Sequence, residues 1–239
     1  MVNRMVLFSG GKDSMYALER CAEDGGIDLL VSIVSVNRDT RLHAGPETNE
    51  NFRKTQLASL DFPTEEIIVG DGKNYLGEIY FGLKSIVDTR GIRQLVTGDL
   101  WHPYTGGIGD MLAGALNVTI TRPAREACPS REYARAYVMD LINRGMESTL
   151  VSVRENVLPS EFVGRNLNLR LVDELEKMGI DSSGESGEYQ STVNFSRLMN
   201  RRLIIDAYDV SLAEGKNGKE RFHRMNIKEF HTEDANRND

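Results

Sequence analysis

The chain has 239 residues, of which 40% are hydrophobic and 27% charged, a composition typical of a globular protein with one sizeable core or two modest ones. Its 29 lysines and arginines are outnumbered by 36 aspartates and glutamates, and this net charge of −7 argues against a surface dedicated to non-specific nucleic-acid binding. The chain has only two cysteines, far apart in sequence, which argues against a disulfide framework. No apolar stretch approaches the ~20 residues that a membrane span needs, and no signal-peptide pattern is present. Together these features predict a cytoplasmic location.

The first half of the chain alternates short apolar runs with amphipathic stretches. Residues 29–36 are apolar at nearly every position, as in a strand covered on both faces. The alternation predicts an α/β fold, a parallel sheet with helices on both faces, which binds its ligand at the carboxyl ends of the strands. The predicted strands are 4–8, 29–36, 66–69, 94–97 and 118–120, and the predicted helices are 12–24, 47–60, 75–90 and 109–116.

After Pro123 the pattern changes to two helices and four strands, which predicts a smaller α+β lobe. The helices are expected at 130–144 and 167–178, and the strands at 147–153, 189–195, 202–210 and 220–226. The sequence therefore predicts three parts: a nucleotide-binding domain at 1–123, the smaller substrate-binding lobe at 124–231, and a disordered tail at 232–239.

A glycine loop (residues 9–14) separates the first predicted strand from the first predicted helix. It reads Ser9, Gly10, Gly11, Lys12, Asp13 and Ser14. Paired glycines let the backbone adopt positive φ and approach a ligand closely. The helix that follows directs its unpaired N–H groups and its positive dipole end at the loop, and Lys12 adds a cation. The loop therefore predicts a phosphate site.

The spacing identifies the kind of phosphate site. A Walker A loop is excluded, because Asp13 stands where its hydroxyl residue belongs and Val6 where its first glycine belongs, and the dinucleotide fingerprint fails as well. The loop instead resembles the pyrophosphate loop (PP-loop), SGGxDS, of the N-type ATP pyrophosphatases. That resemblance implies cleavage of Mg²⁺-bound ATP between its α and β phosphates, with a carbonyl group activated as its adenylate.

A second unusual segment has two Gly-Glu dipeptides three residues apart, in an acidic loop (residues 183–188) that opens a predicted strand. Glu185 and Glu188 are suited to bind ammonium, orient an amine nucleophile or hold Mg²⁺. On spacing alone, a turn with two solvated acids is favoured. The segment is, however, similar to the GE-x-GEY/F-x-T signature of the diphthine–ammonia ligase family, a branch of the N-type ATP pyrophosphatases.

The resemblance covers nearly the whole chain, and it includes Gly98-Asp99 with Tyr104, and Gly164-Arg165 followed by Leu167 and Asn168. It implies a Rossmann-like (adenine nucleotide alpha hydrolase-like) ATP-binding half and a smaller C-terminal lobe. The implied activity amidates the carboxyl group of diphthine, a modified histidine of a translation elongation factor. ATP and ammonium, or another amine, are consumed, and AMP and pyrophosphate are released.

The resemblance also implies roles for individual residues. ATP contacts are expected from Ser9, Gly10, Gly11, Lys12, Asp13, Ser14, Gly98 and Asp99. Catalytic roles are expected for Lys12, Asp13, Glu185 and Glu188, with Asp13 as the Mg²⁺ ligand. Substrate contacts are expected from His43, Asn49, Tyr104, Gly187, Tyr189 and Thr192.

Residues 100–107 and 121–125 depart from the family pattern, so we expect an altered acceptor pocket beside an intact ATP loop. Three alternatives stay open: a ligase for a small-molecule carboxylate, a PP-loop enzyme that modifies tRNA, and a nucleotide-binding module without turnover. The oligomeric state also stays open, with a homodimer as one option.

Overall fold

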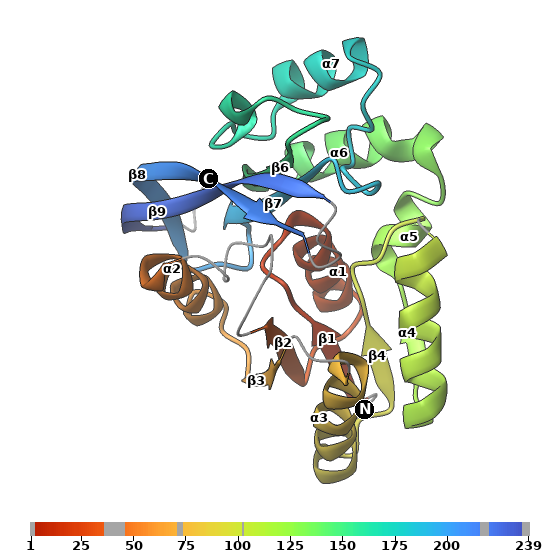
Figure 1. Cartoon of the computed structure of the whole chain (residues 1–239). Coiled ribbons are helices and arrows are strands. Elements are labelled where there is room, and N and C mark those ends of the chain that lie inside the picture. Colours follow the sequence, from red (N-terminus) through yellow and green to blue (C-terminus); the bar gives the residue numbers. More distant parts are fainter. Residues whose placement is uncertain (1–2, 36–45, 71–73, 102, 216–219, 236–239) are drawn as a thin grey trace. The chain divides into compact units, whose positions relative to one another are not determined.

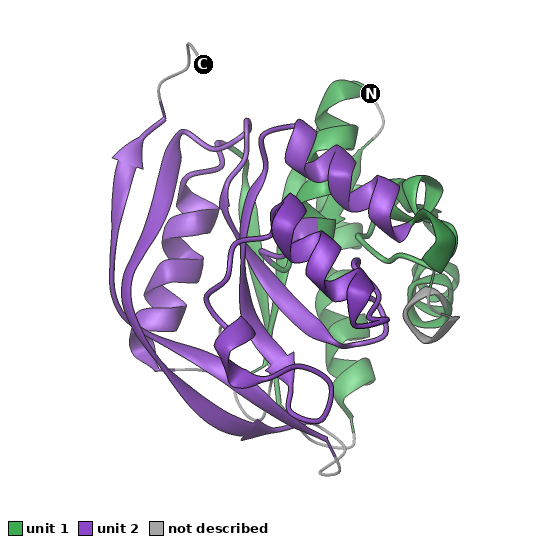
Figure 2. Ribbon diagram, turned by 90° about the horizontal axis from the view of Figure 1, so that it is seen from above, with its two compact units in different colours: residues 1–9, 13–37, 62–133 green, residues 10–12, 38–61, 134–239 purple. Residues whose placement is uncertain are grey.

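The structure is a computed structural model, and it describes residues 3–35, 46–70, 74–101, 103–215 and 220–235 (Figure 1). The chain divides into two compact units that interleave along the sequence (Figure 2). The first unit comprises Met1–Ser9, Asp13–Asn37 and Phe62–Tyr133, and the second comprises Gly10–Lys12, Arg38–Asp61 and Ala134–Asp239. The predicted domains are continuous in sequence, whereas these units are not, and the boundary at residue 123 stays a prediction.

The first unit contains the predicted parallel sheet, which confirms the α/β fold. Its strand order is β3-β2-β1-β4-β5. The strands are β1 (Arg4–Leu7), β2 (Leu29–Ser35), β3 (Thr64–Val69), β4 (Gln94–Val96) and β5 (Thr119–Thr121). The helices are α1 (Lys12–Glu23), α3 (Tyr75–Arg90), α4 (Pro103–Leu116) and α5 (Pro123–Ala127), with a 3-10 turn, η2 (Arg131–Tyr133), at the end.

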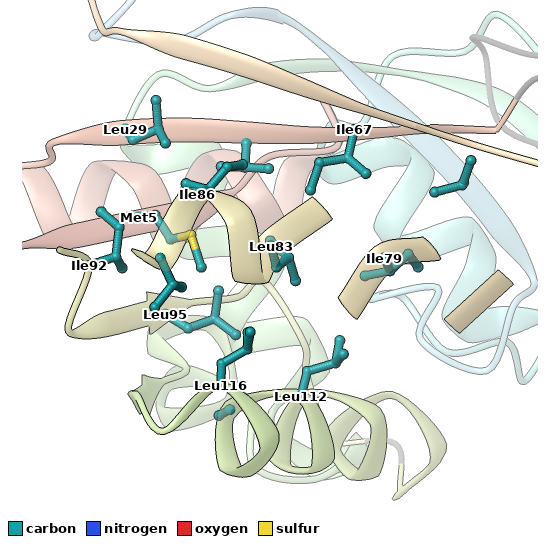
Figure 3. Packing of buried hydrophobic residues seen from close by; sticks show 14 residues of the cluster. Met5, Leu29, Ile67, Ile79, Leu83, Ile86, Ile92, Leu95, Leu112 and Leu116 are labelled. Atoms are coloured by element: carbon teal, nitrogen blue, oxygen red, sulfur yellow. The ribbon is translucent and has the colours of Figure 1, made fainter. Parts of the chain in front are cut away.

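The core of the first unit forms where apolar positions of the central strands meet α3 and α4. Met5 of β1 pairs in register with Leu29 of β2 and Leu95 of β4, and all three side chains are fully buried. Leu83 of α3 and Leu112 of α4 complete this cluster (Figure 3). Helix α4 begins six residues earlier than the predicted helix, because Pro103 occupies the first helical position, where a missing N–H group costs nothing.

The order of these strands reverses between β1 and β4. In parallel sheets of this kind, ligands bind where the order reverses, outside the carboxyl ends of the strands. The glycine loop follows β1, and Gly98-Asp99 follows β4. Two segments that are distant in sequence thus leave the sheet at the expected binding edge.

The second unit contains an antiparallel sheet of order β7-β6-β9-β8. Its strands are β6 (Glu147–Arg154), β7 (Tyr189–Phe195), β8 (Arg201–Glu214) and β9 (Arg221–Asp234). Its helices are α2 (Glu47–Ala58), α6 (Ala134–Asn143) and α7 (Leu169–Lys177), with the 3-10 turn η3 (Ser160–Phe162). The prediction of a separate α+β lobe in the C-terminal half is confirmed.

Helix α2 lies between β2 and β3 in sequence but packs on β9 of the second unit. The Asn49 side chain donates to the carbonyl of Met225 (3.0 Å) and accepts from the N–H of Ile227 (2.7 Å). Phe52 meets Phe230 edge to face, with ring centroids 5.3 Å apart. Helix α2 therefore belongs to the second unit, although it lies among the strands of the parallel sheet in sequence.

Strands β8 and β9 are longer than predicted, and β9 extends through Asp234 into the predicted tail. The sequence there is too polar to reveal a strand. Cross-strand pairs compensate for the small apolar area: Lys228 contacts Asp209 at 2.8 Å, and His231 contacts Asp206 at 2.8 Å. Among the helices of the described ranges, none combines the length and apolar character that crossing a membrane requires.

Candidate active site

The first unit supplies the two ends of the glycine loop. The hydroxyl oxygen of Ser14 lies 3.2 Å from the N–H of Ser9 and 3.1 Å from its hydroxyl, which closes the loop over the first turn of α1. A Cβ atom on Gly98 would lie 2.6 Å from backbone atoms of Asp13 and Ser14. The backbone after β4 therefore touches the start of α1, and only a glycine permits this approach.

Asp99 follows Gly98 and is held by two neighbours in the first unit. It accepts a hydrogen bond from the hydroxyl of Thr97 (2.8 Å), and its carboxylate lies 3.6 Å from Nε of Arg122. Burial nevertheless raises the pKa of Asp99 above its ordinary value, despite the opposing effects of Thr97 and Arg122. The Arg122 guanidinium also contacts Asp110 at 2.8 Å.

The raised pKa of Asp99 predicts a pH dependence of stability. Between the ordinary pKa of 3.8 and the higher folded value, the native state binds more protons than the unfolded state. The contribution of Asp99 to the free energy of unfolding is therefore fully present below pH 3.8, and it is lost as the pH rises through the pKa of the folded state. We expect Asp99→Asn to remove this loss of stability, measured as the free energy of unfolding against pH. Asp61→Asn, at an exposed residue of the second unit, is the control. An unchanged pH profile in Asp99→Asn would contradict the assignment.

The middle of the glycine loop belongs to the second unit, where it extends the edge of β7. The N–H of Val193 donates to the carbonyl of Gly10 at 2.9 Å. The side-chain amide of Gln56, from α2, donates to the carbonyls of Gly10 (2.9 Å) and Val193 (2.7 Å). Gly10 has a φ of +81°, and a Cβ atom there would collide with the Gln56 side chain. Gln56 thus fastens the glycine loop to β7.

Lys12 lies beside the same strand. Its side chain is only 4% exposed, and Nζ lies 5.6 Å from the ring centroid of Tyr189, a favourable cation–π geometry. The Lys12 N–H lies 3.5 Å from the hydroxyl oxygen of Ser191. Tyr189 is fixed in turn, because its hydroxyl donates to the carbonyl of Ser182 at 2.6 Å. Tyr189 therefore touches both Lys12 and the segment that carries the acidic loop.

The acidic loop is shaped by glycines and by Arg154 of β6. Gly184 and Gly187 have φ values of +71° and +80°. The Arg154 guanidinium donates to the carbonyl of Ser186 (2.8 Å), and it leaves no room for a Cβ on Gly187. The backbone N–H of Arg154 donates to the carbonyl of Glu188 (2.9 Å). The carboxylate of Glu188 is partly buried, with Oε2 out of contact with solvent. The loop thus holds a carboxylate in a sheltered place beside β7.

Comparison with protein-family models gives two matches along the chain. Residues 2–106 match the diphthamide synthase N-terminal domain, and residues 134–227 match the diphthamide synthase C-terminal domain. The chain belongs to the diphthamide synthase family. No curated protein matches the chain. Membership makes the chain a PP-loop, ATP-dependent ligase associated with diphthamide biosynthesis, and it implies the use of ATP.

The structure brings some of the predicted site residues together. Within the second unit, Gly10 and Lys12 adjoin the strand of Tyr189 and Thr192, and the Gln56 amide lies 3.4 Å from the Thr192 hydroxyl. Within the first unit, Asp13 and Ser14 adjoin Gly98. Asn49 is fully buried, and its side-chain hydrogen bonds join α2 to β9. His43 lies outside the described residues, and so does the side chain of Tyr104, whose backbone is in α4.

Gln56 is the residue that the sequence did not reveal. A glutamine in a helix does not by itself indicate a function. Asn49 and Gln56, however, lie on the same buried face of α2 as the apolar residues Phe52 and Leu57. Amides on a buried stripe must find partners, because an unpaired buried polar group is costly. That pattern was the available clue.

Removing the Gln56 amide is expected to destabilise the enzyme. Gln56→Met keeps the shape of the side chain but leaves the buried carbonyl of Val193 without this donor. We expect the free energy of unfolding to fall by about 1–3 kcal/mol. Chemical denaturation measures the change, and Asn51→Met, on the exposed face of α2, is the matched control. Equal stability of Gln56→Met and the wild type would contradict the role of this residue.

The described residues also fit Mg²⁺ bound together with a nucleotide. They contain no group of three histidines, cysteines or acids that would hold a metal alone. Mg²⁺ in nucleotide sites needs only one or two carboxylates besides the phosphates and water. Asp13, in the first turn of α1 and partly exposed, suits that arrangement.

Proposed function

We propose that this protein adenylates the carboxyl group of a protein-borne diphthine and transfers the acyl group to ammonia. One observation carries the proposal. The N–H of Val193, in the strand β7 that follows the acidic loop in sequence, donates to the carbonyl of Gly10 in the glycine loop at 2.9 Å. Within the second unit, the middle of the glycine loop therefore lies beside the strand that follows the acidic loop, an arrangement that suits a two-step ligase.

In the first step, the acceptor carboxylate attacks the α phosphorus of ATP. A new P–O bond forms, the bond to the β phosphate breaks, and pyrophosphate leaves. We assign Lys12 and the N–H groups at the start of α1 to the phosphates, where they offset the charge that develops on the leaving group. We assign Asp13 to Mg²⁺, which supplies charge neutralisation at the phosphates when bound.

In the second step, ammonia attacks the acyl carbon and AMP leaves. Ammonium must lose a proton before its nitrogen becomes nucleophilic, and we assign this proton to the acidic loop, with Glu188 as acceptor and Glu185 as a second ammonium ligand. The two steps balance: one carboxylate, one ATP and one ammonium give one amide, one AMP, one pyrophosphate and two protons. One proton leaves ammonium before the attack, and the second leaves the nitrogen as AMP departs.

The test is to supply ATP, Mg²⁺, ammonium and an elongation factor that carries diphthine. We expect the modified histidine to change from carboxylate to amide by peptide mass spectrometry, with one AMP formed per amide. A reaction without ammonium is the control. Formation of AMP only with a small-molecule carboxylate would instead support a metabolite ligase.

A further inference from the structure

A cavity lies within the second unit, and its lining includes no residue of the glycine loop or of the acidic loop. Its volume is about 610 Å³, inside the ~300–1,000 Å³ range of ligand pockets. It lies between the end of α6, the start of β6, the first half of β8 and residues 164–168. That last segment belongs to the sequence resemblance but has no role in the proposed chemistry.

Residues 164–168 form a fixed wall of this cavity. The N–H of Gly164 donates to the carbonyl of Leu150 (2.8 Å), and that of Leu167 donates to the carbonyl of Ser148 (2.8 Å). The hydroxyl of Tyr208, from β8, donates to the carbonyl of Val163 at 3.1 Å. Gly164 has a φ of +89°, and a Cβ atom there would collide with Tyr208. The wall is therefore held against both β6 and β8.

Neutral polar side chains from β6, β7 and residues 164–168 meet at the cavity. The hydroxyl of Thr149 lies 2.7 Å from Oδ1 of Asn194 and 3.0 Å from Oδ1 of Asn166. The Asn194 amide donates to the carbonyl of Leu203 at 3.1 Å, which also joins β7 to β8. The single hydroxyl hydrogen of Thr149 serves one of these two oxygens at a time, and the exposed Asn166 keeps a side-chain amide at the cavity. Its N–H groups are suited to donate to a carbonyl of an occupant.

The charge and the apolar groups of the lining define the kind of occupant. Among the described lining residues only Glu147 carries a charge, and both of its oxygens are held by Arg202 at 2.9 and 3.0 Å. Phosphate, carboxylate and ammonium groups therefore find no complementary charge. Tyr208 is the one aromatic residue among the described lining residues, and its hydroxyl is held by the carbonyl of Val163. The other apolar lining residues, such as Leu167, Leu203 and Met225, are aliphatic, whereas bases usually stack on aromatic rings. An uncharged amide with an aliphatic side chain fits best.

Apolar side chains continue from this cavity along β8. Tyr208, Val210 and Leu212 are 41%, 40% and 47% exposed. They alternate along the strand and therefore share one face of it. Strand β8 is also an edge of the four-stranded sheet. We call the cavity, together with these three residues, the aliphatic groove.

We propose that the aliphatic groove binds an extended, uncharged segment of the protein acceptor through an aliphatic side chain. The cavity takes the side chain and one peptide group, and β8 supports the chain beyond it. The identity of the acceptor rests on the proposed function, but the chemistry of the groove does not.

The first experiment tests the groove without any acceptor. The full-length enzyme is titrated with N-acetyl-L-leucine methylamide, and side-chain amide signals are followed by NMR. We expect saturable shifts at Asn166 and Asn194, and none with adenosine at equal concentration. Absence of saturable shifts, or binding of adenosine in place of the leucine amide, would overturn the proposal.

The second experiment tests the role of the groove in acceptor binding. Leu212→Arg is expected to raise the KM for the diphthine-bearing elongation factor roughly tenfold or more. Met178→Arg, at a residue 45% exposed in the same unit but outside the groove, is the matched control and should leave that KM unchanged. Thermal melts establish that both variants fold. Equal KM values for Leu212→Arg and the control would overturn the proposal, even if the leucine amide binds.

These outcomes separate the two proposals. If the wild type forms no AMP with the elongation factor, the proposed function fails, and the titration alone decides whether the groove takes an aliphatic peptide. If AMP forms but Leu212→Arg behaves like its control, the groove proposal fails and the proposed function stands.

Discussion

Lys12→Ala is expected to slow pyrophosphate release by about 100- to 1,000-fold, the usual effect of removing one group that stabilises developing charge. The Lys12 side chain is 4% exposed, and its Nζ lies over the ring of Tyr189, so the cation is preorganised before the nucleotide binds. Release of pyrophosphate from ATP, with acceptor at saturation, measures the effect. Wild-type rates in Lys12→Ala would contradict the role of this residue.

Two further variants separate the charge of Lys12 from its packing. Lys12→Arg keeps the charge but replaces the compact ammonium with a planar guanidinium, and we expect only partial activity. Lys177→Ala removes an exposed lysine from the end of α7 and should leave the rate unchanged. Thermal melts of Lys12→Ala show whether the loss of rate reflects unfolding.

Glu188→Gln is expected to reduce amide formation by about 100- to 10,000-fold, the contribution typical of a general base. The amide side chain keeps the size of the carboxylate but cannot accept a proton from ammonium. The first step should continue, so AMP should form in excess over amide as the adenylate is hydrolysed. The ratio of amide to AMP measures this uncoupling.

The pH dependence sharpens the test of Glu188. Raising the pH supplies free ammonia, which needs no base, and should restore part of the amide formed by Glu188→Gln. Glu161→Gln, in the exposed 3-10 turn η3, is the control and should keep the wild-type ratio. If Glu188→Gln lost both AMP and amide in proportion, the residue would act in the first step or in folding instead.

Local patterns predicted the parts of the fold that local interactions determine. The apolar runs of β1 and β2 and the glycine loop between β1 and α1 are contiguous, so the sequence displays the strand, the turn and the helix start together. The same holds for Gly184 and Gly187, whose positive φ values follow from the need for tight turns in the acidic loop. These features needed no knowledge of distant contacts.

Distant contacts determine what the sequence did not predict. The association of α2 with β9 depends on Asn49 reaching the backbone of Met225 and Ile227, some 176 residues away. The hydrogen bond between Gln56 and Gly10 spans 46 residues, and neither segment alone identifies the other as its partner. The full length of the β8–β9 hairpin depends on cross-strand ion pairs such as Lys228 with Asp209, which hydropathy along one strand cannot show.

The central claim, that AMP becomes attached to a carboxyl group, is tested most directly by isotope transfer. The acceptor carboxylate is labelled with oxygen-18, and the products formed with ATP and ammonium are examined by mass spectrometry. An acyl adenylate predicts that one labelled oxygen appears in the phosphate of AMP and that pyrophosphate is unlabelled. Label in inorganic phosphate, with ADP as the nucleotide product, would contradict the account.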